Sequence, residues 1–200
     1  MKKVRVPMKS VHAASQLSGV ALIAGWQMNS VTEATPTKPY QVIWVTGDGQ
    51  SIVRFIDDFM IEVPYAYIES ETPERIVRAI QKFVDVYSHD EIQKLTDSAT
   101  TAEECDLAVR LLALIAPPVF DSAFFEFFRK CLTLPDARLQ RRAILAIGYV
   151  GWKEFRPVLE TLEKEAPDTE VRELARIALE GFEKYGFRKD EEPSPSGESA

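Results

Sequence analysis

Three short segments carry the residue types that enzymes and binding sites most often use. Gly47-Asp48-Gly49 follows a strand-like run, so it could begin a phosphate-binding loop. The third glycine of a dinucleotide-binding fingerprint is missing, however, and no helix is predicted to follow it. We therefore interpret this segment as the turn of a β-hairpin. His89-Asp90-Glu91 could form a catalytic cluster, but Ser88 and Glu91 fit the capping-box pattern that begins a helix, and we favour the cap.

The third candidate is the pair of cysteines, Cys105 and Cys131, which are far apart in the sequence. No metal-ligand spacing is present, and a serine triad would have to use His89 as its base. We therefore predict no catalytic residue, no metal site and no cofactor. The two cysteines are expected at adjacent ends of antiparallel helices, where their sulfurs could be close. We interpret them as small core residues, which would remain thiols in a reducing cytoplasm and could form a disulfide after export.

The charge distribution limits the classes of partner. The chain of 200 residues has 24 basic and 31 acidic residues, which give a net charge of −7. Residues 1–32 contain four basic residues and no acidic one, so the remainder is more acidic than the whole. A nucleic-acid-binding surface needs clustered basic residues, so the composition argues against that class. No segment is long and apolar enough to predict a membrane span.

Residues 1–38 are predicted to be a leader or a disordered extension. The basic segment Met1–Lys9 is followed by a short apolar run, Leu17–Trp26, and then by polar residues. A secretory signal has this order, but here the apolar run is short and interrupted. Translation from Met28 is an alternative interpretation. The sequence therefore predicts a cytoplasmic protein and leaves export open.

Residues 39–97 are predicted to form a small α/β unit with a three-stranded sheet. Tyr40–Val45 and Ile52–Ile56 are strand-like runs around the Asp-Gly turn, and apolar residues alternate with other residues from Phe59 to Tyr67. We place this third strand at an edge or at a bulge, because Pro64 lies within it and cannot donate to a ladder. A helix begins at the Thr-Pro-Glu sequence that follows, since it offers a hydroxyl cap, a proline and an acid in order.

Residues 98–187 contain an internal repeat with a period of about 32 residues, within the range of solenoid proteins. Each of the two clearest copies reads as a helix that begins after a Pro-Asp pair and presents an apolar stripe. The aligned pairs are Pro135 and Pro167, Asp136 and Asp168, Leu139 and Val171, Ala143 and Ala175, and Ala146 and Ala178.

This repeat resembles the HEAT repeat family, in the variant called phycobilisome lyase HEAT-like. The resemblance rests on the Pro-Asp start, on Arg141-Arg142-Ala143 and Val171-Arg172, and on the alanine-rich helix that ends at Gly148–Gly151. It covers about half of the chain, its C-terminal half. It implies that an arginine braces the aspartate of an adjacent repeat, with Arg172 and Asp136 as the candidate pair.

The predicted fold class is therefore α+β. We expect a small three-stranded sheet plus a helix, followed by a short all-α HEAT-like solenoid of about two and a half repeats in residues 98–187. Residues 188–200, which are rich in proline, serine and charged residues, are predicted to be a disordered tail.

We interpret the chain as a non-enzymatic protein–protein interaction scaffold or adaptor whose partner is another protein. In the repeats that it resembles, the second helices line a concave face, and aromatic side chains are enriched at interface hot spots. The candidate partner-binding residues are Phe125, Tyr149, Trp152, Glu126, Arg129, Lys130, Glu160, Glu163 and Lys164.

Two other functions stay open at this point. Some proteins with similar repeats attach bilin chromophores to cysteines of phycobiliproteins, so the resemblance also implies a bilin lyase-like chromophore attachment factor as an alternative. The second alternative is an exported adaptor that is stabilised by a disulfide between Cys105 and Cys131.

Overall fold

The computed structural model describes residues 1–10 and 12–186, which form two compact units. The first, here called the sheet unit, consists of Met1–Thr100 and Arg110–Ile115. The second, here called the helical unit, consists of Thr101–Val109 and the residues from Ala116 onward. Helix α4 (Ala102–Ile115) is divided between them.

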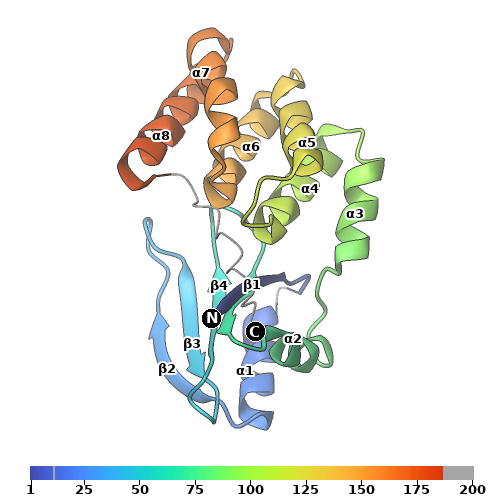
Figure 1. The fold of residues 1–200 in the computed structure, drawn as a ribbon, viewed down its shortest axis with the longest axis vertical. Coiled ribbons are helices and arrows are strands. Elements are labelled where there is room, and N and C mark those ends of the chain that lie inside the picture. The colour runs from blue at the N-terminus through green and yellow to red at the C-terminus, as the bar shows by residue number, and fades with distance from the viewer. Residues whose placement is uncertain (11, 187–200) are drawn as a thin grey trace, which may run out of the picture. The chain divides into compact units, whose positions relative to one another are not determined.

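The sheet unit contains a five-stranded antiparallel sheet (Figure 1). The strand order is β1-β5-β4-β3-β2, so that the first two strands of the sequence lie at opposite edges. The helices of this unit are α1 (Ala13–Ile23), α2 (Pro73–Gln81) and α3 (His89–Ser98). The strands are β1 (Lys2–Pro7), β2 (Gln27–Thr32), β3 (Tyr40–Val45), β4 (Ile52–Asp57) and β5 (Tyr65–Ser70).

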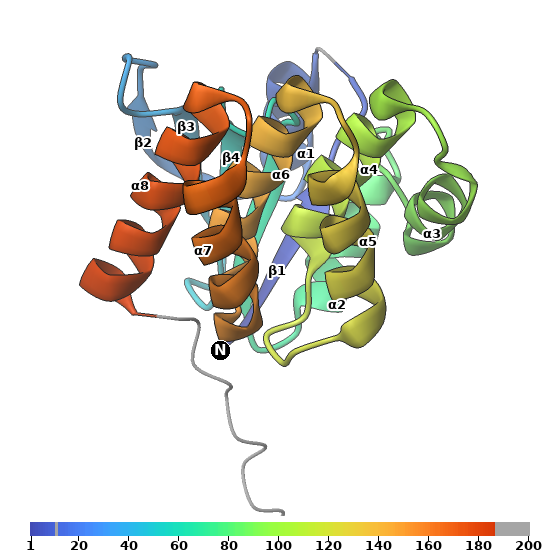
Figure 2. The ribbon, with the colours of Figure 1, turned by 90° about the horizontal axis from the view of Figure 1, so that it is seen from above.

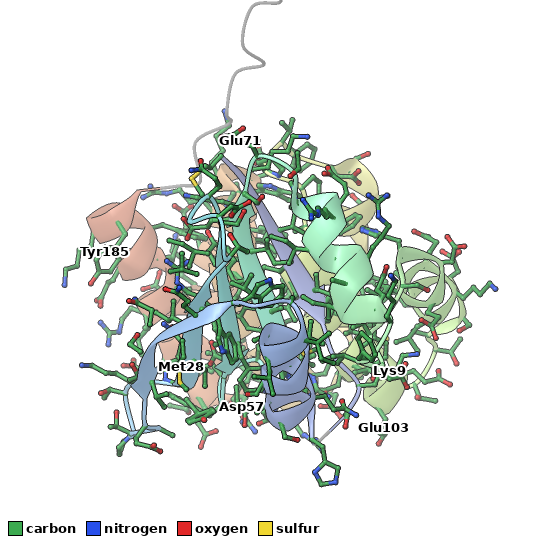
Figure 3. All side chains as sticks on the ribbon, turned by 90° about the horizontal axis from the view of Figure 1, so that it is seen from below. Lys9, Met28, Asp57, Glu71, Glu103 and Tyr185 are labelled. Atoms are coloured by element: carbon green, nitrogen blue, oxygen red, sulfur yellow. The ribbon has the colours of Figure 1, made fainter. Side chains whose placement is uncertain are left out.

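One face of the sheet is buried under α1 and α2, which lie on the same side of the strands (Figure 3). Side chains alternate between the two faces of a strand, so every second residue points into this core. Helix α2 contacts β1 and β5 directly and also touches α1. The strand residues of this core are Val6, Val42, Trp44, Val53, Phe55, Ala66 and Ile68, and the helix residues are Ala13, Leu17, Val20, Ala21, Ile76 and Ile80.

The opposite face of the sheet carries charged and aromatic side chains. Tyr67 lies between two arginines from neighbouring strands, with the guanidinium carbon of Arg5 5.9 Å and that of Arg54 5.4 Å from its ring centroid. Arg54 also forms an ion pair with Glu69. These contacts join charged and aromatic side chains of neighbouring strands on this face.

The prediction of a three-stranded sheet is wrong, because residues 1–38 supply two strands and a helix. They were expected to be a leader or an extension, yet Lys2–Pro7 forms β1 and pairs along its length with β5. Leu17 and Val20, from the apolar run that suggested a signal, are buried in the core on α1. The cause of the error is that β1 pairs only with a strand far away in the sequence.

The expected third strand is displaced along the chain. The alternating segment from Phe59 to Tyr67 predicts a strand, but β5 begins only at Tyr65 and lies inside the sheet rather than at its edge. Ile61 and Val63 are buried in the loop before it. Between them, Glu62 has a φ of 50°, which favours glycine, and its carbonyl accepts a hydrogen bond of 3.2 Å from Arg110.

The helical unit contains four further α-helices after α4, and one short 3₁₀ segment, within its described residues. Helix α6 contacts α5 and α8, and α7 packs against α8. These elements are α5 (Ser122–Thr133), α6 (Ala137–Val150), η1 (Lys153–Phe155), α7 (Arg156–Glu165) and α8 (Thr169–Tyr185).

The predicted starts of the two repeated helices are confirmed. Asp136 accepts a hydrogen bond of 2.8 Å from the amide of Leu139 at the start of α6. Asp168 accepts one of 2.9 Å from the amide of Val171 at the start of α8. Each carboxylate therefore satisfies a backbone donor that the helix itself leaves free.

The predicted fold class as a whole is wrong. Across residues 1–10 and 12–186 the structure is mixed α/β, with a five-stranded antiparallel sheet and eight α-helices. These helices and their contacts do not show a solenoid of two and a half repeats. Within the same ranges, no helix combines the length and apolar character that crossing a bilayer would take. The predicted tail, residues 188–200, lies outside the described residues.

The arginine–aspartate pair implied by the resemblance is also wrong. Arg172 donates locally to the carbonyl of Ala166 at 2.5 Å and to that of Pro167 at 3.2 Å, and it does not bind Asp136. Two other pairs join the helices instead. Arg141 lies 3.5 Å from Asp168, and Arg142 lies 3.2 Å from Asp106 with both side chains largely buried.

We expect Leu17→Ala to lower the free energy of unfolding of the sheet unit by about 2–5 kcal/mol, because Leu17 is completely buried between α1 and the sheet. Urea denaturation of the full chain, followed by circular dichroism, measures the change. Ser18→Ala, on the exposed side of the same helix, is the control and should alter stability by less than about 0.5 kcal/mol. Equal stability of the Leu17→Ala variant and the unsubstituted protein would contradict a structural role for residues 1–38.

Candidate functional site

A cleft of about 410 Å³ lies in the sheet unit beside the turn between β3 and β4. Its volume falls within the range of small-molecule binding sites. The end of α1, the β3–β4 turn and the first two turns of α2 supply its walls. The lining residues are Ala24, Trp26, Thr46, Gly47, Asp48, Ser51, Ser70, Thr72, Arg75, Ile76 and Ala79.

The β3–β4 turn is held by a hydrogen-bond network around Asp48. The Thr46 hydroxyl donates to the Asp48 carboxylate at 2.6 Å, and the amide of Gln50 donates to the same oxygen at 3.0 Å. These bonds, the hydroxyl first, hold the pKa of Asp48 below its ordinary value. Gly49 has a φ of 71°, which a glycine adopts without strain. The hairpin interpretation of Gly47-Asp48-Gly49 is therefore confirmed.

The floor and rim of the cleft suit binding better than acid–base chemistry. Ser51 and Ser70 are buried and hydrogen-bonded to each other through their hydroxyls at 2.8 Å. The exposed guanidinium of Arg75 forms no hydrogen bond or ion pair with any other described residue. Asp48 is a weak base, because its pKa is lowered. The lining therefore offers a cation, an anion and hydroxyls, but no nucleophile activated by a base.

His89 begins α3, and the capping-box interpretation of its neighbours is confirmed. The Ser88 hydroxyl accepts from the amide of Glu91 at 3.2 Å, and the Glu91 carboxylate accepts from the amide of Ser88 at 2.8 Å. Lys9 donates to the same carboxylate at 2.6 Å. The Lys9 ammonium and the two groups of Ser88 lower the pKa of Glu91 to about 2. Of the His-Asp-Glu sequence, Glu91 is therefore held by the capping box and by Lys9.

Cys105 on α4 and Cys131 on α5 are both buried and both free. Burial, followed by the neighbouring thiol of Cys105, raises the pKa of Cys131 well above its ordinary value. The two thiols therefore face each other in the helical unit as unreactive core residues. The predicted proximity of the sulfurs is confirmed.

The three aromatic residues predicted to bind a partner do not form an exposed group. Trp152 is 2% exposed, and its indole N–H donates to the carbonyl of Pro117 at 3.3 Å. Phe125 is half-buried and packs on Phe155, with ring centroids 5.1 Å apart. Tyr149 is also half-buried. Trp152 thus belongs to the core of the helical unit, and the prediction that it is a binding anchor is wrong.

Three of the six charged residues predicted for the same face form ion pairs within their own helices. Glu126 pairs with Arg129 on α5 at 2.5 Å, and Glu160 pairs with Arg156 on α7 at 2.9 Å. The Lys130 ammonium lies 5.6 Å from the ring centroid of Phe127. The two remaining members of the predicted face, Glu163 and Lys164, lie near the end of α7. Ion pairs of this kind stabilise a helix by a few tenths of a kcal/mol. They do not by themselves indicate a binding surface for a partner.

The two edges of the sheet differ in how they are protected. β1 carries Lys2, Lys3 and Arg5 and ends at Pro7. The segment after α2 covers its end, where the amide of Tyr87 donates to the carbonyl of Pro7 at 3.0 Å. Charge, proline and covering segments are the usual means by which proteins prevent edge strands from pairing with other chains.

β2 lies at the opposite edge of the sheet (Figure 2) and lacks these protections. All six of its residues are exposed, and none is charged or proline. Met28 is 64% and Val31 47% exposed, and Met28 is labelled on this strand in Figure 3. The pairing with β3 shifts register between Met28 and Ser30, so Asn29 forms a bulge. An uncharged, exposed edge strand is able to accept another strand.

Sequence reasoning missed both edge strands. The signal for β1 is the alternation of Val4, Val6 and Met8 with Lys3, Arg5 and Pro7, which has the period of a strand with one buried face. The basic residues of this segment also fit a leader. β2 has no comparable pattern, because its bulge breaks the alternation.

No group of three or more histidine, cysteine, aspartate or glutamate side chains in the described ranges is placed to hold a metal ion. Comparison of the chain with protein-family models, with curated proteins and with solved structures gives no match.

We expect the carboxyl group of Glu91 to titrate near pH 2, and Lys9→Met to raise its pKa, because the ammonium of Lys9 stabilises the charged form. Since the pKa is lowered in the folded chain, the stabilisation is present above the ordinary carboxyl range and is lost as the pH falls towards 2. Carbon-detected NMR titration measures both values. Lys3→Met, which removes a positive charge from β1 rather than from Lys9, serves as the control and should leave the pKa of Glu91 unchanged.

Oxidation of the unfolded or locally opened chain should join Cys105 to Cys131. With copper phenanthroline as the oxidant, each thiol loses one hydrogen, and intact-mass spectrometry should show a product lighter by two hydrogens. Cys105→Ser should abolish this product. Exclusive formation of intermolecular disulfides would show that the two sulfurs do not meet within one chain.

Proposed function

We propose that this protein is a protein–protein interaction module, an adaptor without catalytic activity, and that its binding element is the open edge of β2. The observation that carries the proposal is the contrast between the two edges of one sheet. β1 is charged and partly covered, whereas β2 is uncharged and fully exposed. The proposed partner contributes an extended segment that pairs with β2 as an additional strand.

The backbone of β2 supplies the affinity in this proposal. One side of the strand pairs with β3, so the N–H and C=O groups that point to its other side are available to a partner. Each hydrogen bond gained contributes about 0.5–1.5 kcal/mol net. Met28 and Val31 add apolar surface that becomes buried, at about 25 cal/mol per Å².

Residues 27–32 support the proposal better than the face first predicted on the helical unit. Trp152 is buried, and Glu126 and Glu160 are paired within their helices. The resemblance to HEAT repeats remains a prediction, and the proposal does not depend on it.

The proposal predicts that peptides selected by phage display on the immobilised full chain bind at β2. In ¹⁵N-labelled protein, their addition should shift the amide resonances of residues 27–32 and slow the hydrogen exchange of those amides. Val31→Lys should weaken binding by about tenfold or more, corresponding to about 1.4 kcal/mol, because the charge must be desolvated beside the added strand.

Val31→Thr is the matched control, since threonine keeps the β-branched shape and adds no charge. It should retain most of the affinity. Resonance shifts confined to other elements, or equal binding by the lysine and threonine variants, would overturn the assignment of β2 as the binding element.

A further inference from the structure

We infer that the strand that pairs with β2 is β2 of a second copy of this chain. This inference rests on the proposed function, because it names the partner for the same edge. It adds three observations: the faces on which the residues of β2 lie, the symmetry of their sequence, and the absence of charge around them.

The bulge at Asn29 places both apolar residues of β2 on one face of the sheet. Met28 is opposite Trp44, and Val31 is opposite Val42, and both partners are buried under α1 and α2. Residues that face each other across two strands share a face. Without the bulge, residues 28 and 31 would point to opposite faces, because side chains alternate along a strand.

The polar residues of β2 lie on the other face. Gln27 is opposite Val45, Ser30 opposite Ile43 and Thr32 opposite Gln41. β2 therefore presents an apolar pair on the face covered by helices and polar residues on the opposite face.

This pattern is self-complementary under two-fold symmetry. If a two-fold axis passes between Asn29 and Ser30, an antiparallel copy of β2 places Met28 opposite Val31 of the second copy, and Val31 opposite its Met28. Gln27 is then opposite Thr32, and Asn29 opposite Ser30. Apolar residues meet apolar ones on one face and polar residues meet polar ones on the other. An interface of this kind repeats each favourable contact, as two-fold interfaces do.

The absence of charged residues in and before β2 also permits this pairing. Residues 10–32 contain no lysine, arginine, aspartate or glutamate, so no like charges are brought opposite each other at β2. A two-fold axis through Val4 of β1 would instead place Lys3 opposite Arg5 of the second copy, so like charges would meet. Of the two edges, only β2 can therefore pair with itself without electrostatic repulsion. The result is one antiparallel sheet that continues through both copies.

Sedimentation velocity of the full chain over a range of concentrations tests the inference. We expect a species with twice the mass of the 22.6 kDa chain. Val31→Lys should weaken dimerisation by about a hundredfold, since the two-fold axis brings two lysines into the interface and each costs about tenfold. Val31→Thr should dimerise like the unsubstituted protein.

Cysteine cross-linking locates the interface independently of the lysine variant. A mixture of Met28→Cys and Val31→Cys chains should form a heterodimeric disulfide on mild oxidation, because the two positions face each other. A mixture of Gln27→Cys and Val31→Cys chains should not, because these residues lie on opposite faces. The buried native cysteines, Cys105 and Cys131, remain in both mixtures.

The outcomes separate this inference from the proposed function. A monomer whose β2 still binds the selected peptides overturns the inference and leaves the proposed function standing. A dimer that is insensitive to Val31→Lys and forms no cross-link between positions 28 and 31 also overturns it. A monomer that binds no peptide at β2 overturns both.

Discussion

The burial of one sheet face under two helices is the constraint on which the sheet unit depends. Helix α1 must cross from β1 at one edge to β2 at the other, and α2 packs on β1 and β5. The core beneath these helices contains residues of β1, β5, β4 and β3 but none of β2. β2 therefore continues the apolar face through Met28 and Val31 without a helix to cover it. The exposed edge follows from the way the core is built.

Electrostatics act mainly to fix local structure in this protein. Lys9 and Ser88 hold the Glu91 carboxylate at the start of α3, and Thr46 holds that of Asp48 in the β3–β4 turn. In the helical unit, Arg142 meets Asp106 in a largely buried pair. These charged groups bind other residues of the same chain, either within one helix or turn or between two neighbouring elements. β2 has no charged residue and takes part in none of these ion pairs.

Four turn and capping signals in the sequence predicted local structure correctly. The Asp-Gly turn, the capping box at Ser88 and the aspartate caps at Asp136 and Asp168 were all confirmed, because each depends on residues within four positions. Apart from the displaced third strand, the main errors concern contacts between distant residues. The strand β1 has a partner far along the chain, and Trp152, which follows the end of α6, is buried by Pro117 and the surrounding phenylalanines. The periodicity of apolar residues within a helix does not predict whether a residue just beyond the helix, such as Trp152, is buried.

The pairing of β1 with β5 also has a consequence for the order of folding. In the sheet, Lys2 lies opposite Ser70 and Pro7 opposite Tyr65, so the first strand of this sheet to be synthesised has the last as its partner. The hairpin of β3 and β4 can close earlier, because its strands are adjacent in sequence. Pairing between distant strands is slow, since a long loop must close before any contact is gained. Until β5 is synthesised, β1 has no partner in the sheet, and its two lysines and its arginine are residues of the kind that oppose the pairing of a free strand with other chains.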